Sequence, residues 1–370
     1  MKIGIFVTFL PPHIGGIETV AENQIRALAA EGHSVRVVTS AYGTPSESQQ
    51  DPHVVISRIP VWNWFEEKMG AVFPLFAPSL ITASYRVVKE SDIVHVHDGF
   101  YLTSLVAAFW CRVLRTPMVM TQHVDLVPHP SSLVMFVQKA VYATTGRFIF
   151  ATSKRIVVLN SRVHDFLRSK NVPEAKITFL PNGIDTALYR PAENEREVTE
   201  LRKKFRLPLN KTVTLFVGRF VPKKGFTKLQ KLSVKPGSVL AFAGGDAPAG
   251  TARANHMYLG KVDHDEMPLL YRAVDRFILP SEGEGFPMTI QEAMASGLSV
   301  VTTNDPAYDL YRLSEREITL IEPTVSTLQS VLENDGLAKI GSHARSYAVK
   351  HFSLDVHAKR LAALYEEVRR

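Results

Sequence analysis

Short apolar runs alternate along this chain with longer segments in which apolar residues recur three or four positions apart. The first run covers 2–7, and after a glycine-containing loop the helical spacing extends from Ile17 to Leu28. Gly32 predicts the end of that helix, and the β-branched run 35–39 predicts the next strand. A strand, a helix and a strand in this order form a βαβ unit, whose right-handed crossover predicts parallel strands.

Two series of such strands follow one another along the chain. After the opening unit, the first series continues with predicted strands at 93–96, 118–121 and 155–159. The second series consists of predicted strands at 213–217, 239–243, 276–280 and 299–303. Because the segments between them are long enough for helices, the pattern predicts an α/β protein with two Rossmann-like, doubly wound parallel sheets.

The polar stretch 185–210 separates the two series. We therefore expect one domain at 1–188 and a second at 189–351. The last segment, 352–370, carries its apolar residues along one stripe and is expected to form an amphipathic helix that needs a surface to cover.

The composition is that of a globular protein with enough apolar residues for two cores. Of 370 residues, 45% are hydrophobic and 21% are charged. Cys111 is the only cysteine, which excludes an internal disulfide and favours a reducing compartment. The first residues lack the features of a secretory signal, and no segment reaches the roughly 18 to 20 apolar residues of a membrane span. A cytoplasmic protein is expected.

Positive charge is concentrated in one part of the chain. The net charge is +7, and residues 201–235 hold eleven Lys and Arg and no acid. This distribution predicts either a solvated basic face or an anionic partner. Nucleic acid, an anionic membrane and a nucleoside diphosphate are the candidates, but the basic residues lack the regular aromatic interleaving of a nucleic-acid surface, so no nucleic-acid partner is expected.

The segment 281–297 has the strongest chemical signature and lies between two predicted strands. Pro287 suits the first turn of a helix, and Gly297 suits its end. The free amides at the start of this helix, from Met288 and Thr289 onward, form an anion cradle that the helix dipole strengthens. The segment therefore predicts a phosphate site at the carboxyl edge of the second sheet.

Two carboxylates flank this predicted phosphate site. Glu284 precedes the helix, and Glu292 lies on its second turn. Acids near phosphate repel it, so we expect both to accept hydrogen bonds from hydroxyl groups, such as those of a ribose and a sugar. The alternative is that Glu292 is an exposed helix residue and Glu284 an ordinary loop acid.

Two further elements point to the same ligand. Arg219 and Lys224 follow a predicted strand, where both side chains can pair with phosphate oxygens and take the place of a metal. Gly15 and Gly16 offer backbone amides at the equivalent edge of the first domain. Together the elements predict a diphosphate held between two domains, with polyols on both sides.

These segments, in this order, resemble a retaining glycosyltransferase of the GT-B fold, in the large family 4 also described as glycosyl transferases group 1. The resemblance covers almost the whole chain. It rests on the following segments: 15–18, 92–95, 122–123, 180–185, 218–219, 224–225, 244–245 and the paired glutamates.

The resemblance implies roles for individual residues. Arg219 and Lys224 would bind the donor diphosphate, Glu292 the ribose, and Glu284 the transferred sugar, which His123 would also face. The implied catalytic residues are Arg219, Lys224, Glu284 and His123. The remaining implied donor contacts are Gly15, Gly16, Val262, Phe286, Met288 and Thr289.

The resemblance also implies what each domain does. The domain at 1–188 would serve the acceptor, the domain at 189–351 would bind the nucleotide-sugar, and the helix at 352–370 would cross back onto the first domain. The implied reaction moves a hexose or related sugar from a UDP- or GDP-sugar to a hydroxyl of a glycan or polyprenyl-linked acceptor. No metal and no cofactor besides this co-substrate is expected.

Three other protein classes compete with this hypothesis. A catalytically silent GT-B carbohydrate-binding subunit keeps the fold, but the intact glutamates and the Arg219 and Lys224 pair argue against it. A GT-B phosphorylase or a nucleotide-sugar epimerase is disfavoured by the lack of an evident pyridoxal phosphate lysine motif.

Two spacings in the second domain are shorter than the resemblance implies. They lie between Gly225 and Gly244 and between Gly245 and Gly260, and they indicate a trimmed second domain.

The remaining motifs receive plainer interpretations. The segment 263–265 spells an Asp-x-Asp but is expected to open a helix. His95 and His97 are expected to point to opposite faces of their strand and so not to share a metal. The aromatic stretch 62–85 predicts a buried helical hairpin or, with the basic residues of 139–176, a surface for an acceptor or for the inner face of the plasma membrane.

Overall fold

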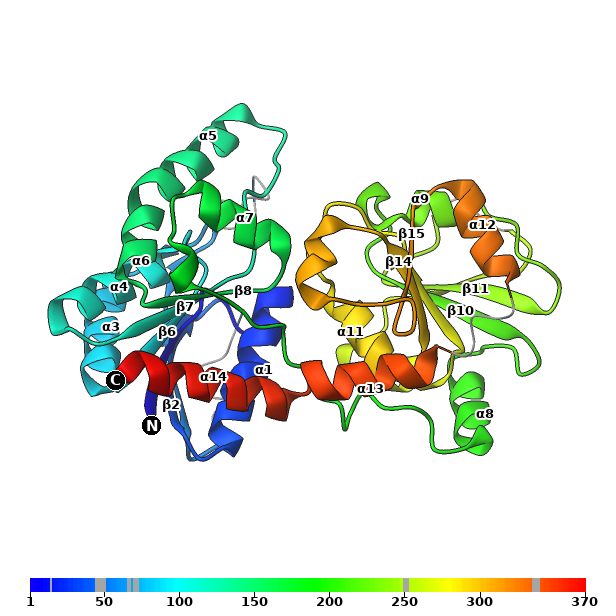
Figure 1. The fold of residues 1–370 in the computed structure, drawn as a ribbon, viewed down its shortest axis with the longest axis horizontal. Helices are drawn as coiled ribbons and strands as arrows, with labels where there is room; N and C mark the ends of the chain where they lie inside the picture. The colour runs from blue at the N-terminus through cyan, green and yellow to red at the C-terminus, as the bar shows by residue number, and fades with distance from the viewer. Residues whose placement is uncertain (14, 44–50, 65–67, 69–72, 249–252, 335–339) are drawn as a thin grey trace. The chain divides into compact units, whose positions relative to one another are not determined.

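We describe a computed structural model of the chain (Figure 1). It describes residues 1–370 except 14, 44–50, 65–67, 69–72, 249–252 and 335–339. The chain forms two compact units: the first contains Met1–Gly183 and Leu354–Arg370, and the second contains Ile184–Ser353. The unit boundaries therefore fall after 183 and 353, where the sequence analysis expected them after 188 and 351.

The first unit is built on a seven-stranded parallel sheet with the order β3-β2-β1-β6-β7-β8-β9. Its strands are β1 (Lys2–Phe6), β2 (Ser34–Ser40), β3 (Val54–Ile59), β6 (Ile93–His97), β7 (Met118–Gln122), β8 (Arg155–Val158) and β9 (Ile177–Phe179). In the centre of the sheet, Ile5 of β1 pairs with Val37 of β2 and with His95 of β6. Strands covered on both faces become continuous apolar runs in the sequence, which is why these strands were predictable.

Helices cover both faces of this sheet, as in other doubly wound folds. They are α1 (Gly16–Ala30), α3 (Ser79–Glu90), α4 (Leu102–Leu114), α5 (Ser132–Val141), α6 (Arg147–Thr152), α7 (Ser161–Ser169) and α14 (Leu354–Arg369). A π-helical turn (Tyr142–Gly146) joins α5 to α6, and a 3₁₀ turn (Glu174–Lys176) precedes β9.

The last helix, α14, is part of the first unit and packs beside α1 (Figure 1). Leu361, Leu364 and Tyr365 join the same buried cluster as Ile25 and Leu28 of α1. The apolar stripe predicted for the final segment therefore covers the first sheet. Both chain termini consequently lie in the first unit.

The second unit contains a six-stranded parallel sheet with the order β12-β11-β10-β13-β14-β15. Its strands are β10 (Thr212–Val217), β11 (Ser238–Ala243), β12 (His256–Gly260), β13 (Arg276–Leu279), β14 (Ser299–Thr303) and β15 (Thr319–Ile321). The central strands β10, β11, β13 and β14 are the four that the sequence predicted. The edge strands β12 and β15, like β3 and β9 of the first unit, were not predicted, because they carry half-buried residues and no continuous apolar run.

The helices of the second unit are α8 (Glu195–Lys204), α9 (Phe226–Leu229), α10 (Met267–Arg272), α11 (Met288–Ala295), α12 (Val325–Glu333) and α13 (Gly341–Phe352). Short 3₁₀ turns lie at Pro222–Lys224, His264–Glu266 and Pro306–Tyr311. α9 is a single turn of four residues and lies in the segment between Gly225 and Gly244, whose spacing the sequence analysis noted as short. The segment 263–265 leads through its 3₁₀ turn into α10, as expected.

In the described part of 62–85, the burial expected for a hairpin of helices is wrong. This part contains two short antiparallel strands, β4 (Val61–Trp62) and β5 (Leu75–Phe76), followed by α3. The Trp62 side chain is 58% exposed and stacks on Trp64. Aromatic content alone therefore did not predict burial. Phe65 lies outside the described residues.

None of the helices in the described ranges is both long and apolar enough to cross a membrane.

Candidate active site

The carboxyl ends of β10 and β13 mark the point where the strand order of the second sheet reverses. β10 and β13 are neighbours in the sheet. The chain continues from β10 to β11 on one side and from β13 to β14 on the other, so the two connections run in opposite directions. In doubly wound sheets, ligands bind outside the carboxyl edge at such a switch point. Arg219 and Lys224 follow β10, and Glu284 follows β13, so three predicted residues flank this point.

Lys224 and Glu284 are held against each other at this edge. Nζ of Lys224 lies 2.8 Å from Oε2 of Glu284, and each side chain is 18% exposed. A second ion pair, of 2.7 Å, joins Lys228 to Glu282, whose backbone N–H donates to the carbonyl of Lys223. The loops after β10 and β13 are therefore bonded together, which fixes a cation and a carboxylate side by side.

Two glycines let the backbone approach closely around this pair. Gly225 has a φ of 78°, and a Cβ there would lie 2.4 Å from the carbonyl oxygen of Pro280. Gly244 has a φ of 124°, and a Cβ there would lie 2.4 Å from the carbonyl oxygen of Gly218. Both positions are closed to any side chain, so these two glycines are a steric requirement of the scaffold.

Arg219 lies on an exposed turn after Gly218. None of the ion pairs found in the described part of the chain involves its side chain. A guanidinium at a strand end without a carboxylate partner is available for phosphate oxygens.

Helix α11 begins and ends as its sequence suggests, with one difference. Pro287 is the N-cap, with ψ of 141°, and so lies one position before the first turn that was predicted for it. Gly297 has a φ of 74° and donates its N–H to the carbonyl of Met294, which closes the helix. The first turn holds no acid, and the amides of Met288 and Thr289 have no intrahelical acceptor, so this end favours an anion.

Glu292 is buried on α11, with 7% of its surface exposed. The Tyr271 hydroxyl donates to its Oε2 at 3.0 Å, and the Tyr189 hydroxyl is a second partner. Burial raises the pKa of Glu292 to about 7, against the opposite effect of these two hydrogen bonds. Glu292 is therefore not the exposed helix residue of the alternative hypothesis. A buried acid with a raised pKa is costly to the fold and is typical of functional positions.

The other implied contacts of the second unit lie around this helix. The Phe286 ring packs on Tyr311, with 4.1 Å between ring centroids, so only its backbone is available to a ligand. Val262 is half-buried and follows β12. The Thr289 hydroxyl is buried and has no hydrogen-bond partner among the described residues, although it belongs to the first turn of α11.

In the first unit, His123 belongs to a buried polar cluster at the carboxyl edge of the sheet. Its Nε2 lies 2.9 Å from Nδ1 of His97, and its backbone N–H donates to Oδ1 of Asp98 at 2.8 Å. Burial lowers the pKa of His123 to about 3 and raises that of Asp98 to about 7. His123 is therefore neutral at physiological pH, and Nδ1 is the ring nitrogen left for a substrate.

His95 extends this cluster toward α14. Its ring stacks on that of His97 with 4.9 Å between centroids, and its Nδ1 lies 2.5 Å from the Tyr365 hydroxyl. The expectation that His95 and His97 point to opposite faces is wrong, because positions two apart in a strand share a face. Both rings are fully buried, and burial lowers the pKa of each, so they are neutral parts of the core.

The predicted glycine loop lies between β1 and α1. A Cβ at Gly16 would meet nothing within 4 Å, whereas a Cβ at Gly15 would lie 2.2 Å from Oε2 of Glu18. The Glu18 carboxylate also lies 2.8 Å from Nδ1 of His13. The backbone is open at Gly16, but Glu18 would have to move before an anion could reach Gly15.

Three polar residues that the sequence analysis missed support the second-unit site. Tyr189 and Tyr271 hydrogen-bond Glu292, and no sequence spacing connects them to it. Asp305 accepts the N–H of Gly283 at 3.3 Å and so anchors the loop that carries Glu284. Its position after a predicted buried strand is the signal that could have found it.

The structure thus groups the predicted residues by unit. Lys224 and Glu284 are in direct contact, and the following lie on the same loops, on α11 or just after β12 in the second unit: Arg219, Val262, Phe286, Met288, Thr289 and Glu292. His123, Gly15 and Gly16 lie in the first unit. In the part of the chain that the structure describes, no three His, Cys, Asp or Glu side chains gather as a metal site would need.

The two units match two described glycosyltransferase families. Residues 14–188 match Glycosyltransferase Family 4, and residues 197–311 match Glycosyl transferases group 1. Among solved structures, Anabaena HepE in complex with UDP has a TM-score of 0.76 and 18% identity, with 99% of this chain and 100% of that chain covered. WaaG, a glycosyltransferase involved in lipopolysaccharide biosynthesis, has a TM-score of 0.67 and 19% identity, with 98% and 99% covered.

Curated relatives extend over nearly the whole chain. The alpha-monoglucosyldiacylglycerol synthase of Acholeplasma laidlawii is 25% identical, with 99% of this chain and 96% of the relative covered. The UDP-Gal:alpha-D-GlcNAc-diphosphoundecaprenol alpha-1,3-galactosyltransferase of Escherichia coli is 23% identical, with 98% and 97% covered. The expected GT-B fold class is confirmed, and the chain belongs to the family 4 glycosyltransferases.

Proposed function

We propose that this glycosyltransferase moves a hexosyl group from a UDP- or GDP-sugar to a hydroxyl of a glycan or polyprenyl-linked acceptor, with retention of configuration and without a metal ion. The observation that carries the proposal is the Lys224–Glu284 pair at the switch point of the second sheet. Arg219 and the amino end of α11 lie on the same edge and supply the remaining donors for a diphosphate.

Each residue has one proposed task. Arg219, Lys224 and the amides of Met288 and Thr289 bind the diphosphate, while Glu292 binds the ribose hydroxyls. Glu284 binds a hydroxyl of the transferred sugar. The following are proposed as additional contacts to the base, sugar or phosphates: Val262 and Phe286 through their backbones, and Gly15, Gly16 and His123 of the first unit.

Transfer exchanges one bond at the anomeric carbon for another. The acceptor oxygen forms a bond to the anomeric carbon while the bond between this carbon and the β-phosphate oxygen breaks. The electron pair of the broken bond stays on the leaving diphosphate. A phosphate oxygen of the leaving group takes the acceptor proton, and attack from the leaving group's own side gives retention. The main catalytic task is then to stabilise negative charge on the diphosphate, which fixed cations and peptide dipoles do well.

The Lys224–Glu284 ion pair prepares the site for this task. When a donor binds, Lys224 exchanges the carboxylate for a phosphate oxygen, and Glu284 becomes free to accept from the sugar. Both groups are already positioned by the bonded loops, so little reorganisation is needed.

A nucleotide screen tests the donor class. We expect either UDP or GDP to raise the melting temperature, because a ligand that binds only the folded state stabilises it by about 2.7 kcal/mol at a hundred times its Kd. UDP is the first choice, since one similar structure was solved with UDP and the name of one relative includes UDP-Gal. If none of UDP, GDP, ADP and dTDP raised the melting temperature, the proposed function would be contradicted.

The acceptor proposal rests on an exposed apolar surface of the first unit. Large apolar side chains on α5 and on the segment before it are exposed, with Leu133 at 66% and Phe136 at 67%. The other members are Val124, Val127 and Val137. This surface follows His123 directly in the chain, so we propose that it meets the lipid part of a polyprenyl-linked acceptor or the membrane that holds it.

Vesicle flotation tests this surface. We expect the protein to float with anionic liposomes at low salt and less at moderate salt, and a Leu133→Ser/Phe136→Ser variant to float at least severalfold less. The control variant Leu209→Ser/Val349→Ser removes two exposed apolar side chains from the second unit and should float like the wild type. Absence of flotation, or equal flotation of all three proteins, would remove the membrane proposal.

A further inference from the structure

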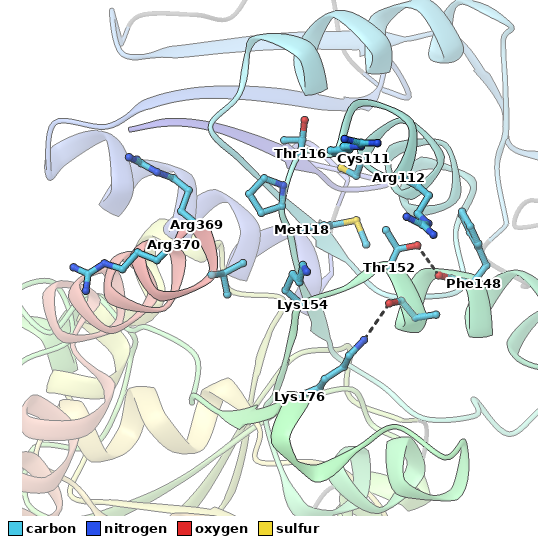
Figure 2. A pocket seen from close by; sticks show the side chains of 14 residues that line it. Cys111, Arg112, Thr116, Met118, Phe148, Thr152, Lys154, Lys176, Arg369 and Arg370 are labelled. Carbon is cyan, nitrogen blue, oxygen red and sulfur yellow. Dashed lines mark hydrogen bonds between the residues drawn. The ribbon is translucent and has the colours of Figure 1, made fainter.

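The first unit has a pocket at the amino edge of its sheet, opposite the carboxyl edge that carries His123. Figure 2 shows this pocket, whose volume is about 720 Å³. It lies where α4 and α6 end and β7 and β8 begin, beside the end of α14. Met118 begins β7 and lines the pocket, whereas His123 follows the other end of this five-residue strand, about 17 Å away at roughly 3.3 Å per residue.

Cations line this pocket, and none of the described lining residues is an aspartate or a glutamate. The cationic lining residues are Arg112, Arg115, Lys154, Lys176, Arg369 and Arg370. Figure 2 shows that the side chains of Arg369 and Arg370 turn away from the centre, while those of Arg112, Lys154 and Lys176 approach it from different elements. Three cations therefore face one cavity.

Three acids pair with Arg155 or with Arg369, whose side chain turns away from the centre of the pocket. Glu367 pairs with Arg155, and Arg369 lies 4.0 Å from Asp92 and 3.6 Å from Glu366. Within the described ranges, none of the ion pairs involves Arg112, Arg115 or Lys154. The positive charge at the centre is therefore not balanced by neighbouring carboxylates.

Hydrogen bonds to carbonyls at helix ends explain the position of only one of these three cations. A helix C-terminus attracts cations, and Lys176 serves this purpose: its Nζ donates to the carbonyls of Ala151 at 3.0 Å and Phe150 at 3.5 Å. Among the described residues, the side chains of Arg112 and Lys154 make no such bond to a helix end. Burial and the charge of Lys154 also lower the pKa of Lys176, which shows that the two cations oppose each other.

We propose that this pocket binds a phosphate-bearing ligand through Arg112, Lys154 and Lys176. A guanidinium and two ammonium groups match the oxygens of phosphate, and the volume suits a ligand larger than a single ion. A second pocket of about 290 Å³ shares Lys176 and adds Arg147 and Lys170, which favours a ligand with more than one phosphate. The ligand is a soluble phosphate compound or an anionic lipid headgroup, which share this chemistry.

Methionine methyl NMR with inorganic pyrophosphate tests the proposal on the full chain. The buried Met118 side chain lines the pocket, and Met288 lies in the proposed donor site, so the two methyl signals report on the two sites separately. We expect a saturable shift of the Met118 signal, with affinity weakened about tenfold or more in Arg112→Gln/Lys154→Gln. The control Lys359→Gln/Arg360→Gln removes two exposed cations from α14 and should bind like the wild type.

The result separates this proposal from the donor proposal and separates the two ligand sources. The pocket proposal is wrong if the Met118 signal does not shift, or if it shifts equally in the Arg112→Gln/Lys154→Gln variant. The Met288 signal tests the donor site independently of this result. If the pyrophosphate shift occurs, vesicles of phosphatidylglycerol distinguish the sources. Retention on these vesicles that depends on Arg112 and Lys154 assigns a lipid headgroup, and pyrophosphate binding without retention assigns a soluble ligand.

Discussion

Replacing Arg219 with alanine is expected to lower kcat by about 10²- to 10³-fold at saturating donor, the usual cost of removing one group that stabilises developing charge. Arg219 is the cleanest position for this test, because it is exposed and makes none of the ion pairs found among the described residues. Its removal therefore leaves no buried partner uncompensated. The measurement is steady-state turnover with the nucleotide-sugar that the nucleotide screen identifies.

Lys224→Ala should lower kcat by a similar factor, about 10²- to 10³-fold. It also leaves Glu284 without its partner, so Glu284→Gln, which loses both the ion pair and the proposed sugar contact, is measured beside it. Lys223→Ala is the matched control, since Lys223 is an exposed lysine on the adjacent position and contributes its backbone carbonyl to the loop contact. Wild-type turnover in Arg219→Ala, with donor saturating, would show that the charge-stabilising role is wrong.

Replacing Glu292 with glutamine is expected to stabilise the second unit at pH 8 and to weaken nucleotide binding. Burial raises the pKa of Glu292 from 4.5 to about 7, so the folded protein holds this proton more tightly than the unfolded chain does. The stability that this proton contributes is present below pH 4.5 and is lost as the pH rises through 7. At pH 8 the ionised carboxylate therefore costs about 3 kcal/mol, which glutamine avoids.

Hydrogen exchange of peptides from α11 and β13, at pH 5 and pH 8, measures this stability within the second unit. The stabilisation should be large at pH 8 and small at pH 5, while affinity for the nucleoside diphosphate falls about tenfold because a charged acceptor is lost. Glu333→Gln, which changes an exposed acid at the end of α12, should do neither. A variant that is destabilised equally at both pH values and binds nucleotide normally would assign Glu292 a structural role instead.

The parts of the fold that follow from local rules were predictable from the sequence. The opening βαβ unit and the end of α11 at Gly297 each depend on neighbouring residues, and the central strands carry continuous apolar runs because helices cover both faces. The parallel-sheet rule then placed Arg219 and Glu284 at one edge, because strands β10 and β13 end there.

The contacts between distant residues could not be predicted in the same way. The pairing of Lys224 with Glu284 and of Tyr271 with Glu292 depends on how the loops and helices pack, and spacing along the chain does not encode it. The burial predicted for 62–85 was wrong for a related reason, because Trp62 is an apolar residue that is exposed in the fold. Burial is a property of the assembled unit, and an aromatic residue alone does not report it.

The most direct test of the central claim is a thermodynamic cycle between the ligand's β-phosphate and the proposed cations. The affinities of the nucleoside diphosphate and of its monophosphate are measured by calorimetry for the wild type, Arg219→Ala, Lys224→Ala and Lys223→Ala. The diphosphate should bind the wild type and Lys223→Ala at least about tenfold more tightly than the monophosphate, since charge-assisted bonds to phosphate are worth about 1.5 kcal/mol or more. This preference should largely disappear in Arg219→Ala and Lys224→Ala. An undiminished preference in both variants would contradict the account, because another part of the protein would then bind the diphosphate.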